Sequence, residues 1–65
     1  MKLIVNGEAT PSEAGDLAAL LRELDLADAV VATALNGSFV PKGERSETPL
    51  GEGDQVEIVA PMKGG

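Results

Sequence analysis

Residues 2–40 read KLIVNGEATPSEAGDLAALLRELDLADAVVATALNGSFV, with one leucine-rich segment between two Asn-Gly pairs. An Asn-Gly pair flanked by strand-like residues is a strong hairpin signal, because a type I′ turn needs positive φ at both central residues. The first pair, Asn6-Gly7, therefore predicts that residues 2–5 pair antiparallel with about residues 8–11.

The leucine-rich segment is predicted to form a helix over about residues 16–25. Asp16 precedes the leucines as a good N-cap residue. A helix of roughly 15 Å is too short to be stable alone, so its apolar stripe, Leu21 included, should be buried against a sheet. The stripe consists of the leucines spaced at i, i+3, i+4 and i+7, which are Leu17, Leu20, Leu21 and Leu24.

The second Asn-Gly pair predicts another hairpin, in which a strand over residues 30–35 turns at Asn36-Gly37 and returns over residues 38–40. Residues 41–53 contain two prolines and three glycines, so they are predicted to form a loop with little regular structure. A last strand is predicted over residues 55–60, with Val56 and Ile58 on one face.

The predicted elements follow one another as hairpin, helix, hairpin, loop and strand, in 65 residues that suffice for one small domain. The helix must cross one face of the sheet, and we expect the last strand to return beside the first. This arrangement is an α+β β-grasp fold, with a mixed four- to five-stranded sheet packed on one helix. We expect residues 1–60 to form the β-grasp domain and residues 61–65 a flexible C-terminal diglycine tail.

The composition argues against an enzyme. The chain has no cysteine and no histidine, which removes disulfides, thiolate metal sites, a cysteine nucleophile and the usual general base. Glu52 and Asp54 flank Gly53, but two carboxylates in a turn fall short of the ligand count of a calcium loop. We therefore expect no catalytic residue and no bound metal in this chain.

The charge balance restricts the kinds of partner. Eleven acidic and five basic residues leave a net charge of −6, which disfavours binding to the phosphates of nucleic acid. Phe39 is the only aromatic residue, so stacking on bases is almost excluded. The apolar runs are far shorter than the ~18 residues of a membrane span, and the start of the chain lacks a signal-peptide pattern. We expect no nucleic-acid partner, no membrane association and a cytoplasmic location.

Residues 61–65, PMKGG, carry the strongest functional signal. Two glycines can thread a narrow channel that would reject any Cβ, and the extended tail would reach roughly 17 Å. The carboxylate of Gly65 is ionised at neutral pH and can attack the α-phosphorus of ATP. The resulting acyl-adenylate is open to a sulfur or nitrogen nucleophile, so we expect a carrier whose reactive group is the end of its own chain.

Several motifs spread along the whole chain resemble one family. They are MKLIVNG at 1–7, ALNG at 34–37, VPK at 40–42, Leu50, GDQVEIV at 53–59 and Gly64-Gly65. On these residues the chain is similar to the ThiS sulfur-carrier proteins of thiamine biosynthesis. Members of that family often have a tryptophan a few residues after the basic position at 42, and this chain has none.

The resemblance implies a ubiquitin-like β-grasp fold and a function at Gly64 and Gly65. A ThiF-type adenylyltransferase would activate Gly65 with ATP and Mg²⁺, neither of which the carrier itself would bind. A sulfur donor such as a cysteine desulfurase would then convert the adenylate to a thiocarboxylate. A ThiG-type thiazole synthase would accept this sulfur in forming the thiazole of thiamine.

Two alternatives share the same end of the chain. A sulfur carrier of the molybdopterin-synthase small-subunit type has the same fold, Gly-Asp turn and diglycine, whereas a ubiquitin-like modifier would form isopeptide bonds. The candidate contacts for partner enzymes are Phe39, Met62 and Lys63. Phe39 lies on a short return strand, where it is either packed or an exposed contact for the adenylyltransferase.

Overall fold

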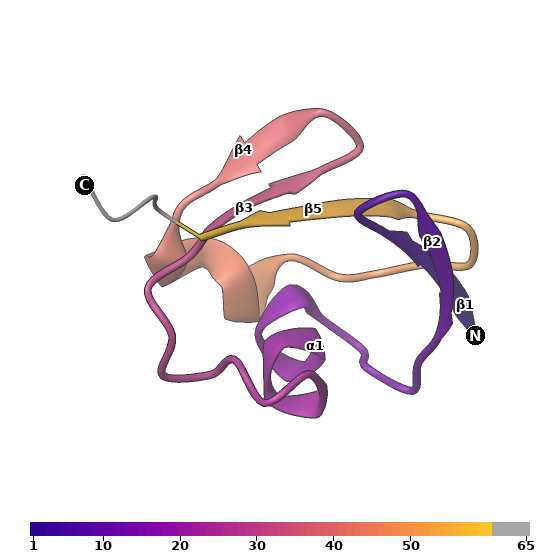
Figure 1. Ribbon diagram of the computed structural model, residues 1–65, viewed down its shortest axis with the longest axis horizontal. Helices are drawn as coiled ribbons and strands as arrows, with labels where there is room; N and C mark the ends of the chain where they lie inside the picture. The colour runs from indigo at the N-terminus through magenta and orange to yellow at the C-terminus, as the bar shows by residue number, and fades with distance from the viewer. Residues whose placement is uncertain (61–65) are drawn as a thin grey trace.

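In the computed structural model, which describes residues 1–60, five strands form one mixed sheet in the order β2-β1-β5-β3-β4. Strands β1 and β5 run parallel, and the other neighbouring strands run antiparallel. The single α-helix, α1, lies on one face of the sheet (Figure 1). The predicted β-grasp fold is thus confirmed, whereas the predicted tail over residues 61–65 lies outside the described residues.

The strands begin and end close to the predicted positions. Their bounds are Lys2–Val5 for β1, Glu8–Pro11 for β2, Ala32–Leu35 for β3, Ser38–Val40 for β4 and Gln55–Val59 for β5. Strand β3 starts two residues later than predicted, because its neighbour β5 ends at Val59, which pairs with Ala32. Val30 consequently has no strand beside it and is 79% exposed.

Both predicted hairpin turns are confirmed by the backbone angles. The φ values are +50° and +85° at Asn6 and Gly7, and +49° and +87° at Asn36 and Gly37. Asparagine tolerates this left-handed region better than most residues, and glycine adopts it without steric cost. The two turns therefore hold the register of β1 with β2 and of β3 with β4.

Helix α1 spans Leu17–Glu23 and begins at the predicted cap. The Asp16 carboxylate accepts a hydrogen bond from the backbone N–H of Ala19 at 2.8 Å, which satisfies one free donor of the first turn. Leu17 and Leu20 are fully buried and pack against the sheet. They belong to the core cluster, which is completed by Leu3, Ala14, Val40 and Val56.

The prediction of an irregular loop over residues 41–53 is wrong for its first half. Lys42–Glu47 form a 3₁₀ helix, η1, whose buried residue is Arg45 at 6% exposure. The Nε of Arg45 donates to the hydroxyl of Thr33 at 3.0 Å, and its Nη2 donates to the carbonyl of Val31 at 2.6 Å. These contacts of Arg45 with strand β3 and with Val31 hold Lys42–Glu47 in place. The proline and glycine content of the segment does not predict such contacts.

Leu21 is buried, as predicted, but its surroundings differ from the prediction. It lies outside the core cluster and lines a pocket between α1 and η1. Of the four leucines of the stripe, Leu21 therefore faces η1 and not the core cluster. Within the described residues, neither helix has the length and hydropathy needed to cross a membrane.

Candidate functional site

The functional residues predicted at the end of the chain, Met62, Lys63, Gly64 and Gly65, lie outside the described residues. The structure does describe the strand that precedes them. Strand β5 lies in the middle of the sheet, between the parallel β1 and the antiparallel β3, and ends at Val59. The candidate site in the described residues is therefore the end of β5 with the sheet surface around it.

The end of β5 is held by the side chain of Asn6. Strand β1 turns away at Asn6-Gly7, after its last pair with β5, Val5 with Val56. Beyond that point the Asn6 amide takes the place of a neighbouring strand. Its Oδ1 accepts from the N–H of Ile58 at 2.8 Å, and its Nδ2 donates to the carbonyl of Ile58 at 3.1 Å. Asn6 thus forms the turn of one hairpin and also binds the last strand.

Asn36 makes a similar contact at the start of β5. Its Oδ1 accepts from the N–H of Gln55 at 2.9 Å, and its Nδ2 donates to Asp54 Oδ1 at 3.2 Å. The other carboxylate oxygen of Asp54 accepts from the N–H of Gly51 at 2.8 Å. The Gly51 N–H and the Asn36 amide, in that order, hold the pKa of Asp54 below its usual value of 3.8. Both ends of β5 are therefore bound by asparagines of the two hairpin turns.

The carboxylates near Gly53 serve the backbone. Glu52 Oε1 accepts from the N–H of Lys2 at 3.1 Å, and Asp54 accepts from Gly51 as above. Gly53 adopts a φ of +81°, as expected for a glycine in a tight turn. Within residues 1–60, no group of three acidic side chains lies where it could hold a metal ion.

An apolar patch lies on the sheet face opposite the helix, next to the end of β5, with Glu57 at its edge. Phe39 is 70% exposed and Val59 60% exposed, and the register links them through Ala34 and Ala32 of β3. We define the apolar patch as Val30, Ala32, Phe39 and Val59. Exposed large apolar side chains that lie together mark interaction surfaces in small soluble proteins.

Phe39 is exposed and not packed, which rules out the first of its two predictions, and its contact with the adenylyltransferase stays a prediction. Sequence reasoning missed Val30 and Val59 as members of this surface. The alternation of inward and outward residues along β5 could have identified Val59, because Val56 faces the core and Val59 lies an odd number of residues away. Nothing in the sequence indicates that Val30 falls outside the sheet.

These features define a class of protein, a ubiquitin-like β-grasp carrier domain. Its central strand is firmly held and leads toward a diglycine, and an exposed apolar patch lies beside the end of that strand. Residues 3–65 match the model of the ThiS family. The chain belongs to the ThiS family, which confirms the resemblance found in the sequence.

Known relatives agree with this assignment. The chain is 39% identical over 61 residues to the sulfur carrier protein ThiS of Thermus thermophilus, covering 94% of this chain and 95% of that protein. It is also 39% identical over 66 residues to a thiazole synthase of Paramagnetospirillum magneticum, where it spans 100% of its own length but 20% of the relative. The crystal structure of the thiamine biosynthesis protein ThiS from Geobacter metallireducens superposes with a TM-score of 0.84 at 33% identity, covering 100% of both chains.

Proposed function

We propose that the chain carries sulfur for the thiazole of thiamine as a thiocarboxylate on Gly65. That it is a sulfur carrier of thiamine biosynthesis follows from its family, and the chemistry at Gly65 is the proposed part. The observation that carries the proposal is the extent of the family match, which runs through residue 65 and includes Gly64-Gly65.

The proposed chemistry starts at the Gly65 carboxylate. One of its oxygens attacks the α-phosphorus of ATP, forming an acyl-adenylate and releasing pyrophosphate. A persulfide sulfur of the donor then attacks the carbonyl carbon and displaces AMP, which leaves an acyl disulfide. A thiol then attacks the donor's sulfur, which forms a disulfide between the thiol and the donor cysteine and releases the thiocarboxylate. The carrier supplies only the carboxylate, and its lack of cysteine leaves the end of the chain as the only sulfur-holding group.

Three partners follow from this sequence of steps. A ThiF-type adenylyltransferase would bind ATP and Mg²⁺ and activate Gly65, and a cysteine desulfurase would supply the persulfide. A ThiG-type thiazole synthase would accept the sulfur. The match to 20% of a protein named thiazole synthase supports this last partner, because a domain like this chain there forms part of the synthase itself.

The apolar patch is proposed as the surface that the adenylyltransferase contacts. Val59 ends β5 just before residues 61–65, so an enzyme that takes up the tail must approach this end of the sheet. Phe39 is the largest exposed side chain of the patch, and no residue of the described part of the chain buries it. Burying an exposed aromatic side chain is a typical source of binding energy at interfaces. We propose Met62 and Lys63 as further contacts within the tail.

The test is intact-protein mass spectrometry after incubation with the adenylyltransferase, ATP, Mg²⁺, a persulfide donor and a thiol reductant. The chain should gain ~16 Da as sulfur replaces one carboxylate oxygen, and the gain should map to the C-terminal peptide. Omitting the donor should leave the acyl-adenylate. Deletion of Gly65 should abolish both products and leave the melting temperature unchanged, because the last strand of the sheet ends at Val59. Gly64→Val should also fail, because its branched side chain would clash in the channel that takes up the tail.

Two results would contradict the proposal. The first is a mass gain that maps to any residue other than Gly65. The second is full activity of the Gly65 deletion. Transfer of the sulfur to a molybdopterin synthase in preference to a thiazole synthase would favour the alternative carrier, and lysine-linked adducts would favour a protein modifier.

A further inference from the structure

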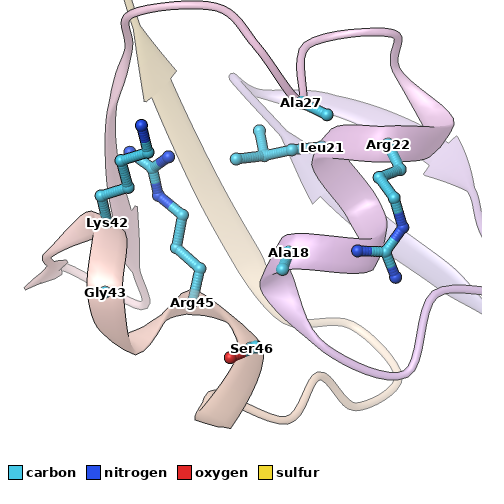
Figure 2. Close-up of a pocket in the computed structure, with 8 residues that line it drawn as sticks. All are labelled: Ala18, Leu21, Arg22, Ala27, Lys42, Gly43, Arg45 and Ser46. Atoms are coloured by element: carbon cyan, nitrogen blue, oxygen red, sulfur yellow. The ribbon is translucent and has the colours of Figure 1, made fainter.

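A pocket of basic character lies between α1 and η1. It has a volume of about 350 Å³ and is lined by Arg22, Lys42 and Arg45, together with small or apolar residues (Figure 2). Three of the five basic residues of the chain thus line one pocket, and no acidic residue lines it. Figure 2 shows the Arg22 guanidinium on the α1 side, apart from the other two, so the positive charge of the η1 side is that of Lys42 and Arg45.

Arg45 is the anchor of this pocket. The residue is only 6% exposed, yet its hydrogen-bond partners, the Thr33 hydroxyl and the Val31 carbonyl, are both neutral. Burial of a charge is costly unless an opposite charge or several hydrogen bonds compensate for it. The Nε and Nη2 bonds fix the guanidinium plane, and within residues 1–60 no acceptor binds the remaining N–H donors. An arginine held in this way is already oriented to receive an oxyanion.

Lys42 adds a second positive charge beside Arg45. Side chains at i and i+3 of a 3₁₀ helix eclipse one another, so η1 projects these two residues in the same direction. Figure 2 shows both side chains extending from η1 in the same direction, and both line the pocket. Two like charges held together repel, and an anion placed between them would relieve this repulsion. Glu44 and Glu47 of the same helix do not line the pocket.

The pocket lies at the end of the sheet from which residues 61–65 continue. The Val31 carbonyl that accepts from Arg45 immediately precedes Ala32, and Ala32 pairs with Val59, the last residue of β5. A protein that takes up the tail therefore approaches the same end of the domain. The pocket is also open to solvent, so a side chain projecting from such a protein can reach it.

We infer that this pocket receives an aspartate or glutamate side chain of the adenylyltransferase that takes up the tail. The carboxylate would accept from the free donors of Arg45 and from the Lys42 ammonium. Its methylene groups would pack against Leu21, Ala18 and Ala27, which line the α1 side. The inference rests on the proposed function for its partner. A carboxylate on a docked protein is favoured over a free anion, because the other contacts of the complex offset the repulsion from the acidic chain.

The test compares two variants that each remove one lysine charge. Lys42→Ala should raise the Kd for the adenylyltransferase about threefold to tenfold, the range of a partly buried ion pair, and should raise KM equally without changing kcat. Lys2→Ala is the matched control, because the Lys2 carbonyl binds Gly53 at the opposite end of β5, and it should change Kd by less than about twofold. The difference between the variants should shrink as salt rises from about 0.05 M to about 0.5 M.

Arg45→Met provides a second variant that keeps side-chain length and removes the charge. The melting curve of this variant reports any loss of folding. Its Kd for the adenylyltransferase is then compared with that of the wild type at a temperature where the variant is folded. In the wild type, the NMR signal of the Arg45 Nε–H should shift when the adenylyltransferase binds and should not shift with inorganic phosphate or acetate.

Each outcome bears on the inference. Equal Kd values for Lys42→Ala and Lys2→Ala, or an Arg45 signal unchanged on binding, would overturn it. An Arg45 shift with phosphate that also blocks binding would replace the protein side chain with a free oxyanion as the occupant. Since Kd is measured apart from turnover, binding without adenylation would overturn the proposed function and leave the pocket supported. A wild type that binds no adenylyltransferase would overturn both.

Discussion

Replacement of Asn6 by glycine should loosen the end of β5 and leave its start intact. Glycine adopts the φ of +50° at this position without strain, so Asn6→Gly removes only the two side-chain hydrogen bonds to Ile58. Each such hydrogen bond contributes about 0.5–1.5 kcal/mol to stability. Because Asn6 is exposed, hydrogen bonds from water to Ile58 compensate for part of the loss. We therefore expect a local loss of about 1–2 kcal/mol, which corresponds to roughly tenfold faster exchange of the Ile58 amide.

The assay is residue-resolved amide hydrogen exchange by NMR, with Asn36→Gly as the matched control. Asn36 occupies the same turn position with a φ of +49°, but its Oδ1 binds the N–H of Gln55 at the other end of β5. Asn6→Gly should accelerate exchange at Ile58, and Asn36→Gly should accelerate it at Gln55. Equal exchange at Ile58 in the two variants would refute the reasoning. We also expect Asn6→Gly to raise the KM of adenylation, because the strand that leads to Gly65 frays.

The remaining predictions concern the core, acid stability and the apolar patch. Leu20→Ala should lower the free energy of unfolding by about 3–5 kcal/mol and leave most of the chain unfolded, whereas Leu21→Ala, at the pocket wall, should lower it by about 2–3 kcal/mol. Chemical denaturation measures both losses, and equal losses would contradict the assigned positions of the two leucines. The Gly51 N–H and an asparagine amide lower the pKa of Asp54 in the folded state, so the stabilisation is complete above pH 3.8 and is lost as the pH falls through the lower folded value. In Asp54→Asn the free energy of unfolding should therefore fall less steeply below pH 3.8 than in the wild type. Acid titrations followed by circular dichroism measure this, and equal curves for the two proteins would contradict the assigned role of Asp54. Phe39→Ser should raise the KM for the adenylyltransferase without lowering the melting temperature, because the ring is 70% exposed; a lower melting temperature would mean that it packs in the fold.

The predicted elements that proved correct depend on neighbouring residues. The turns at Asn6-Gly7 and Asn36-Gly37 require positive φ, which these residues adopt easily whatever surrounds them. The cap at Asp16 and the spacing of the leucines likewise act within a few residues. The family resemblance also needs no knowledge of tertiary contacts, because it rests on short motifs along the whole chain.

Other features became visible only in the folded chain. The loop predicted after Pro41 is a helix because Arg45 reaches Thr33, twelve residues away in sequence. The strand predicted from residue 30 starts later because β5 ends opposite Ala32. In both cases the decisive partner lies on another element, and local propensities carry no information about it.

The two hairpins, the capped helix, the diglycine and the family can be read from the sequence, since short-range backbone preferences and recognisable motifs need no distant partner. The contact of Asn6 with Ile58, 52 residues away, and the exposed patch shared by Phe39 and Val59 are visible only in the folded chain. Only the folded chain brings Arg45 and Lys42 into one pocket. These contacts depend on which strands pair and in which register, and that is settled by the packing of the whole core.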